Sequence, residues 1–304
     1  MLNGVIFTIL TGLTWAGISI MMSMVARYRI SVFLFYWIGN GIAAVIAWLA
    51  FPEWNALKTA YGTALVTLSG LIFLAGFVNV ASQAMMVLTL KLGHNGISIA
   101  ARNCAAVIPF LVGVFVWHNK VGIGRFIGLA MVLTGMAFIV LSRTGSGKTS
   151  RDGISVKWLL AVAASFSFSG TFQLLNSLTA RLTPETLETG LRIPLLLTSC
   201  AVGNCIAFAV SRKRQEKTSM PWYILPGMAV AWSMLAIFSY FFMFRALDCM
   251  NKIGGTALVF PIVIGVNITA FSLYSRFRLR ERYTPLTLCS LLLCVSGIIV
   301  LTLK

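Results

Sequence analysis

Long runs of apolar residues, broken by short polar stretches, repeat along the chain from Val5 to Leu303. A helix needs ~20 mostly apolar residues to cross a hydrocarbon core ~30 Å thick, and these runs are long enough. The pattern therefore predicts an all-α integral membrane protein with ten transmembrane helices. The expected helices span residues 3–24, 31–51, 62–91, 96–117, 121–142, 156–179, 187–210, 222–245, 254–275 and 284–303.

Short patterns from the first half of the chain return in the second half in the same order. Residues 22–27 (MSMVAR) resemble 176–181 (NSLTAR), and residues 109–114 (PFLVGV) resemble 261–266 (PIVIGV), at an offset of about 153 residues. We interpret the chain as a duplicated five-helix unit, with repeats at 1–142 and 156–304 and a basic linker at 143–155. Because five is odd, the second repeat enters the membrane from the opposite side, which predicts an inverted repeat.

The distribution of charge fits a membrane protein. The net charge is +17, yet only 10% of the residues are charged and 59% are hydrophobic. Lys and Arg lie mostly in the short polar stretches, where they set membrane orientation, so nucleic acid is not an expected partner. The positive-inside rule places both termini outside the cytoplasm. We expect a multi-pass protein of a bacterial-type inner membrane.

Five features carry a family resemblance: Trp15, Pro109, Pro261 and the segments 280–286 (RERYTPL) and 297–301 (GIIVL). In these features the chain resembles the drug/metabolite transporter (DMT) superfamily, whose ten-helix members contain two EamA-type units. The resemblance covers the whole chain. It implies a permease with a central cavity lined mainly by the first, third, fourth, sixth, eighth and ninth helices, and a fifth and tenth helix that serve as packing or homodimer surfaces. One departure is that the acidic residue before the last helix is Glu281 in the second repeat but Asn119 in the first.

Arg102 is an ionisable residue inside an apolar run. Such residues are costly in a membrane and usually face a cavity or a partner. Arg102 could bind a carboxylate or phosphate of the substrate through its planar fork. It could equally be half of a structural pair, or an anchor that reaches the membrane interface.

Acidic residues near helix ends are candidates for gating or coupling. Glu188 and Arg192 lie four positions apart, so they would share one face of the seventh helix. They form either a neutral structural pair or a gate that exchanges partners as the two halves move. Because Glu188 and Asp248 are the only plausible titratable groups for proton coupling, we favour facilitated diffusion or exchange over proton coupling.

Uncharged polar residues and tryptophans inside the apolar runs complete the candidate cavity. Each of them could bind substrate or could hydrogen-bond between helices as part of their packing. These residues are Trp15, Asn79, Gln83, Asn103, Gln173, Asn176, Trp232, Ser239, Tyr240 and Asn267.

Other motifs carry no chemistry. Residues 145–149 (GSGKT) are not a phosphate loop, because Ser142 occupies the position of its first glycine. The six cysteines lack metal-binding spacing, so neither a metal nor a cofactor is expected. No clustered His, Asp, Glu or Ser set points to catalysis, so the chain is not expected to be an enzyme.

These features together predict a transporter of a small polar organic metabolite, of the amino-acid or organic-anion type. The inverted repeat predicts alternating access around a midplane cavity, and the family resemblance favours an exporter. The alternative is an importer of a sugar or another neutral metabolite. A flippase for lipid-linked sugars and an intramembrane enzyme fit less well.

Overall fold

The computed structural model describes residues 2–27, 30–51, 63–92, 102–119, 122–144, 156–182, 190–211, 224–278 and 285–302, and every regular element within them is a helix. The helices are α1 (Leu2–Arg27), α2 (Val32–Ala50), α4 (Thr63–Leu92), α6 (Val107–Phe115), α7 (Ile123–Thr144), α8 (Val156–Leu182), α9 (Arg192–Ser211), α10 (Ile224–Asn251), the 3-10 helix η3 (Thr256–Leu258), α11 (Val259–Arg278) and α12 (Pro285–Thr302). The predicted all-α class is confirmed. The predicted linker, apart from the end of α7, lies outside the described residues.

Seven helical segments among the described residues are long and apolar enough to cross a membrane. Three further apolar segments are shorter: Arg102–Phe115, Ile123–Gly135 and Leu288–Leu301. Large apolar side chains face outward, with Leu49 and Ile123 each 82% exposed. A water-soluble surface rarely carries such large exposed apolar areas. These features mark the chain as a multi-pass membrane protein.

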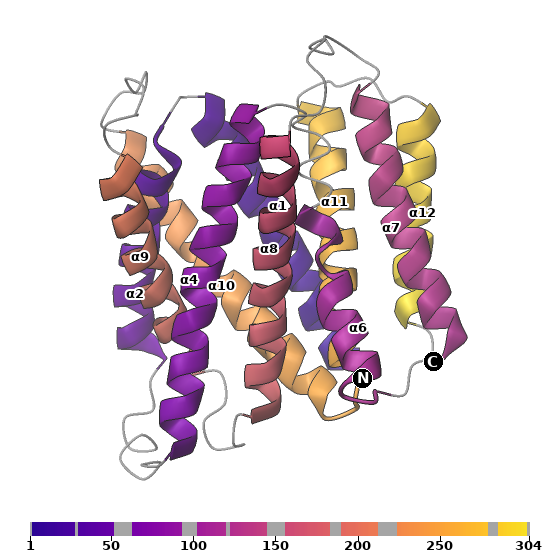
Figure 1. Ribbon diagram of the computed structural model, residues 1–304, viewed down its shortest axis with the longest axis horizontal. Helices are drawn as coiled ribbons and strands as arrows, with labels where there is room; N and C mark the ends of the chain where they lie inside the picture. Colours follow the sequence, from indigo (N-terminus) through magenta and orange to yellow (C-terminus); the bar gives the residue numbers. More distant parts are fainter. Residues whose placement is uncertain are drawn as a thin grey trace.

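Helices from the two halves of the chain pack against one another. α4 packs against α8 and α9, α2 packs against α9 and α10, and α1 packs against α10 and α11. α7 and α12 pack together at one edge of the bundle (Figure 1). The two halves therefore share one core.

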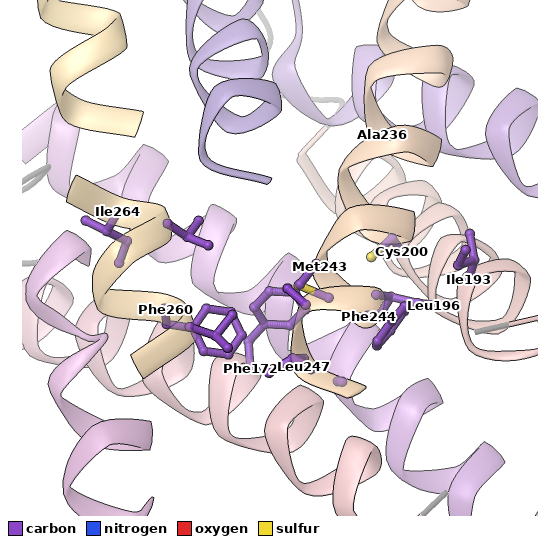
Figure 2. Packing of buried hydrophobic residues seen from close by; sticks show 14 of the residues in the cluster. Phe172, Ile193, Leu196, Cys200, Ala236, Met243, Phe244, Leu247, Phe260 and Ile264 are labelled. Carbon is purple, nitrogen blue, oxygen red and sulfur yellow. The ribbon is translucent and has the colours of Figure 1, made fainter. Parts of the chain in front are cut away.

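That core gathers around α10. Met243, Phe244 and Leu247 of α10 are fully buried. Side chains from α8, α9 and α11 surround them, among them Phe172 and Phe260 (Figure 2). α10 thus forms the centre against which the neighbouring helices pack.

Two prolines shape the helices that contain them. Pro109 has no N–H to donate to Ala105, whose carbonyl instead accepts from the N–H of Ile108 at 3.0 Å. A turn at Ala105 and Ala106 interrupts the helix there. Ahead of Pro261 the backbone likewise forms a tighter turn than an α-helix, the 3-10 helix η3.

Close packing of α4 against α9 depends on Gly76. A Cβ atom at this position would lie 2.5 Å from the Cβ of Ser199 and 3.1 Å from the backbone nitrogen of Cys200. The Ser199 hydroxyl also donates to the carbonyl of Phe73 at 2.5 Å, which holds the two helices together. Small residues at such contacts allow helix backbones to approach closely in membranes.

We expect Gly76→Ala to lower the stability of the protein by about 1–3 kcal/mol, because the added methyl group forces α4 and α9 apart. Thermal unfolding in detergent, followed by tryptophan fluorescence, measures this loss. Gly70→Ala is the matched control on the same helix, because a Cβ at Gly70 meets nothing within 4 Å. Equal losses in both variants would contradict the packing role of Gly76.

Candidate functional site

Arg102 lies near the middle of the bundle, at the start of the apolar segment Arg102–Phe115. Protein surrounds it, yet its side chain keeps some accessible surface. Its electrostatic neighbours are the hydroxyl groups of Tyr36 on α2 and Tyr240 on α10. Within the described residues no ion pair or hydrogen bond of the Arg102 side chain is found.

The local fold explains why Arg102 lies so deep. The apolar segment Arg102–Phe115 covers about 20 Å at 1.5 Å per residue, which is less than a ~30 Å hydrocarbon core. Its far end continues to Trp117 and Asn119, which contact Arg181 near the end of α8. The first residue of the segment therefore lies inside the bundle, level with Tyr240 near the middle of α10.

Polar groups from four further helices meet at this level. Asn79 on α4 donates through Nδ2 to the Tyr240 hydroxyl at 3.4 Å and to the Cys200 sulfur on α9 at 3.7 Å. Tyr36 interacts electrostatically with both Arg102 and Cys200. We name Arg102, Tyr36, Asn79, Cys200 and Tyr240 the Arg102 cluster.

The charge of the Arg102 cluster is its main chemical feature. An arginine at the centre of a membrane helix costs about 3 kcal/mol or more. A planar guanidinium offers five N–H donors that match a carboxylate or a phosphate. The cluster can therefore bind an anionic group that enters the bundle.

The sequence predicted three of these five residues, namely Arg102, Asn79 and Tyr240. Tyr36 and Cys200 were missed, because the cysteines were weighed only as metal ligands and Tyr36 lies near the start of an apolar run. The available signal was a tyrosine hydroxyl inside the apolar run 31–51. Asn103 lies next to Arg102 and is half-buried.

Two other candidate cavity residues make contacts between α1 and α11. Trp15 on α1 lies against Phe260, with ring centroids 6.4 Å apart, and Asn267 on α11 is 3.4 Å from the Ser19 hydroxyl. These contacts join α1 to α11. Gln83 on α4 is buried, and its Oε1 has no hydrogen-bond partner within the described residues.

The candidates on α8 and α10 are buried. Asn176 donates to the carbonyl of Phe172 at 2.7 Å, and Gln173 donates to the Ser169 hydroxyl at 3.5 Å. Both bonds stay within α8. The hydroxyl of Ser239 on α10 is buried, with no hydrogen-bond partner found in the described part of the chain.

Trp232 on α10 packs against residues of α2. Its indole N–H donates to Oδ1 of Asn40 at 3.3 Å. Its ring meets those of Tyr36 and Phe35 edge-on, at centroid distances of 4.6 Å and 5.5 Å. With 4% of its surface exposed, Trp232 joins α10 to α2 beside the Arg102 cluster.

Arg192 forms an ion pair with Asp248, at the start of α9 and near the end of α10. Arg192 is fully buried, and its guanidinium carbon lies 4.6 Å from the ring centre of Phe244. The sequence placed Arg192 and Asp248 in one functional set but paired Arg192 with Glu188. Glu188 lies outside the described residues.

A second polar network at the same end of the bundle was missed by the sequence analysis. Arg181 lies over the ring of Trp117, 4.8 Å from its centre, and donates to Oδ1 of Asn119 at 3.5 Å. Asn119 donates in turn to the hydroxyl of Thr256 at 3.4 Å. The network connects the end of α8 to the segment after α6 and to η3.

Comparison with known proteins shows the fold alone. No protein-family model matches the sequence, and no curated protein matches it. Chains of solved structures do match, 28 in number. One of them, described as "Crystal structure of protein", is 13% identical, with a TM-score of 0.71 and coverage of 98% of this chain and 97% of that chain.

We expect Asp248→Asn to destabilise the protein by about 3–5 kcal/mol, because it leaves the buried Arg192 charge without its carboxylate. Thermal unfolding in detergent measures the change. The double variant Arg192→Met with Asp248→Leu removes both charges and should recover much of the loss. A single variant as stable as the original protein would show that the ion pair contributes little.

Proposed function

We propose that this chain is a transporter that moves a small polar organic metabolite with an anionic group across a bacterial-type inner membrane. The single observation that carries the proposal is Arg102, a cation in the middle of an apolar bundle for which the described residues provide no carboxylate partner. Ionisable groups at such positions typically mark substrate or ion pathways. The anionic group of the substrate would neutralise Arg102 during transit.

We further propose ten spans arranged as two inverted five-helix repeats. The helix contacts support this interpretation, because they occur in pairs that exchange when the two halves are swapped. α4 packs on α8 as α10 packs on α1, and α4 packs on α9 as α10 packs on α2. α6 packs on α8 as α11 packs on α1, and each of these two helices is tightened just before its proline. Inverted repeats allow alternating access around a central site.

The polar contacts at one end of the bundle are candidates for a gate in this cycle. Arg181, Asn119 and Thr256 link the two proposed repeats to each other. The ion pair of Arg192 with Asp248 lies near the same end. For that end to open, these contacts would have to break or exchange partners.

Export is the proposed direction, on the strength of the family resemblance. The second candidate is import of a sugar or another neutral metabolite. The hydroxyl groups of Tyr36 and Tyr240 and the amide of Asn79 favour it, because such groups also bind hydroxyl-rich ligands. The two candidates differ in whether binding depends on the charge of Arg102.

We expect anionic metabolites to raise the melting temperature of the detergent-purified protein, and Arg102→Gln to abolish that effect, because the neutral amide cannot compensate a buried anion. A screen of carboxylates, phosphate esters, sugars and nucleosides measures this, followed by flux into liposomes. Lys157→Gln is the matched control, since it removes one positive charge from an exposed side chain.

Stabilisation by neutral sugars, equal in both variants, would refute the anionic substrate and support the second candidate. If anionic metabolites also fail to raise the melting temperature of Lys157→Gln, the stabilisation depends on the overall charge of the protein and not on a site at Arg102.

We expect both termini to lie on the same side of the membrane, outside the cytoplasm, because the number of spans is even and most Lys and Arg lie in the opposite loops. Epitope tags at each end, probed in intact and in permeabilised spheroplasts, measure their location. Tags on opposite sides would contradict ten spans.

A further inference from the structure

Arg102 sets the hydrogen-bonding character of the cluster, because a guanidinium has donors alone, whereas a tyrosine hydroxyl and an amide can both donate and accept. The Nδ2 of Asn79 is already used by Tyr240 and Cys200. The cluster therefore offers an anionic oxygen the fork of Arg102, with the hydroxyls of Tyr36 and Tyr240 as its electrostatic neighbours.

Among the described residues, no carboxylate that could receive a cation lies at this level of the bundle. The chain has seven acidic residues, and Asp248 is the one that falls among the described residues. Asp248 is paired with Arg192 and lies eight residues beyond Tyr240, about 12 Å along α10. The other six lie between the described helices in the sequence, and none falls within a described span.

Two aromatic rings at the cluster, those of Trp232 and Tyr36, are also covered by their neighbours. An ammonium group can be held over the face of a tryptophan or tyrosine ring. Trp232 is packed against Tyr36 and Phe35 and is 4% exposed, while Tyr36 is 7% exposed. Neither ring leaves an open face for an ammonium group.

We propose that the Arg102 cluster selects organic carboxylates that carry no ammonium group, and discriminates against amino acids with the same carbon skeleton. This inference rests on the proposed transport function and narrows its substrate class. The carboxylate binds the Arg102 fork, while a hydroxyl or keto group beside it can hydrogen-bond to Tyr36, Tyr240 or Asn79. An ammonium group in the same place lies next to the guanidinium, where like charges repel strongly because the surroundings have a low dielectric.

Three pairs of 2-hydroxy and 2-amino acids test this selectivity in the purified full-length protein. The pairs are lactate with alanine, malate with aspartate, and 3-phenyllactate with phenylalanine. They differ in one substituent while keeping shape and carboxylate constant. Ligand titrations followed by tryptophan fluorescence give the dissociation constant of each compound.

We expect at least one hydroxy acid to bind about ten-fold or more tightly than its amino partner. Arg102→Gln should abolish binding of that hydroxy acid, and Lys157→Gln should leave it unchanged. Asn79→Asp, which adds a carboxylate to the cluster, should remove the preference for the hydroxy acid.

Amino acids that bind as tightly as their hydroxy partners, in a manner that depends on Arg102, would overturn this selectivity and leave the transport proposal intact. If neither member of any pair binds, the carboxylate assignment is overturned. If the wider metabolite screen also finds no ligand that depends on Arg102, the proposed anion transport falls as well.

Discussion

Hydrocarbon offers no hydrogen-bond partner, so polar groups inside this bundle depend on contacts within the protein. Many of the described polar side chains make these contacts within their own helix. Thr8 donates to the carbonyl of Gly4, Thr198 to that of Pro194, and Asn204 to that of Cys200. Such bonds allow a helix to carry polar residues without a partner helix. The polar groups that depart from this rule are therefore the informative ones.

Two arginines depart from it in opposite ways. Arg192 is fully buried and has the carboxylate of Asp248, so its charge is compensated inside the protein. Arg102 has hydroxyl and amide neighbours but no carboxylate among the described residues. A compensated pair can hold two helices together, whereas an uncompensated cation attracts an anion from outside. The first fits a structural or gating contact, and the second fits a binding site.

Packing explains how these groups are held in place. α10 lies at the centre of the shared core, and it carries Tyr240 in its middle and Asp248 near its end. Gly76 brings α4 close to α9, which places Asn79 within reach of Cys200. The turn before Pro109 gives the Arg102 segment its shape, and its short length keeps Arg102 inside the bundle. The binding cluster thus depends on helix packing from both halves of the chain.

The sequence by itself determined the helical class, the membrane setting and the presence of Arg102 in an apolar run, because hydrophobic periodicity and the cost of burying charge are local properties. It also selected Asn79 and Tyr240, since polar groups in a membrane are conspicuous. It could not tell which of the eleven candidate cavity residues would meet, nor that Arg192 would contact Asp248 on another helix. Trp15, Asn176 and Trp232 are as conspicuous in sequence as Asn79, yet they lie in other contacts. Only the tertiary structure decided these partners, because the rotation and depth of each helix depend on its packing against helices distant in the chain.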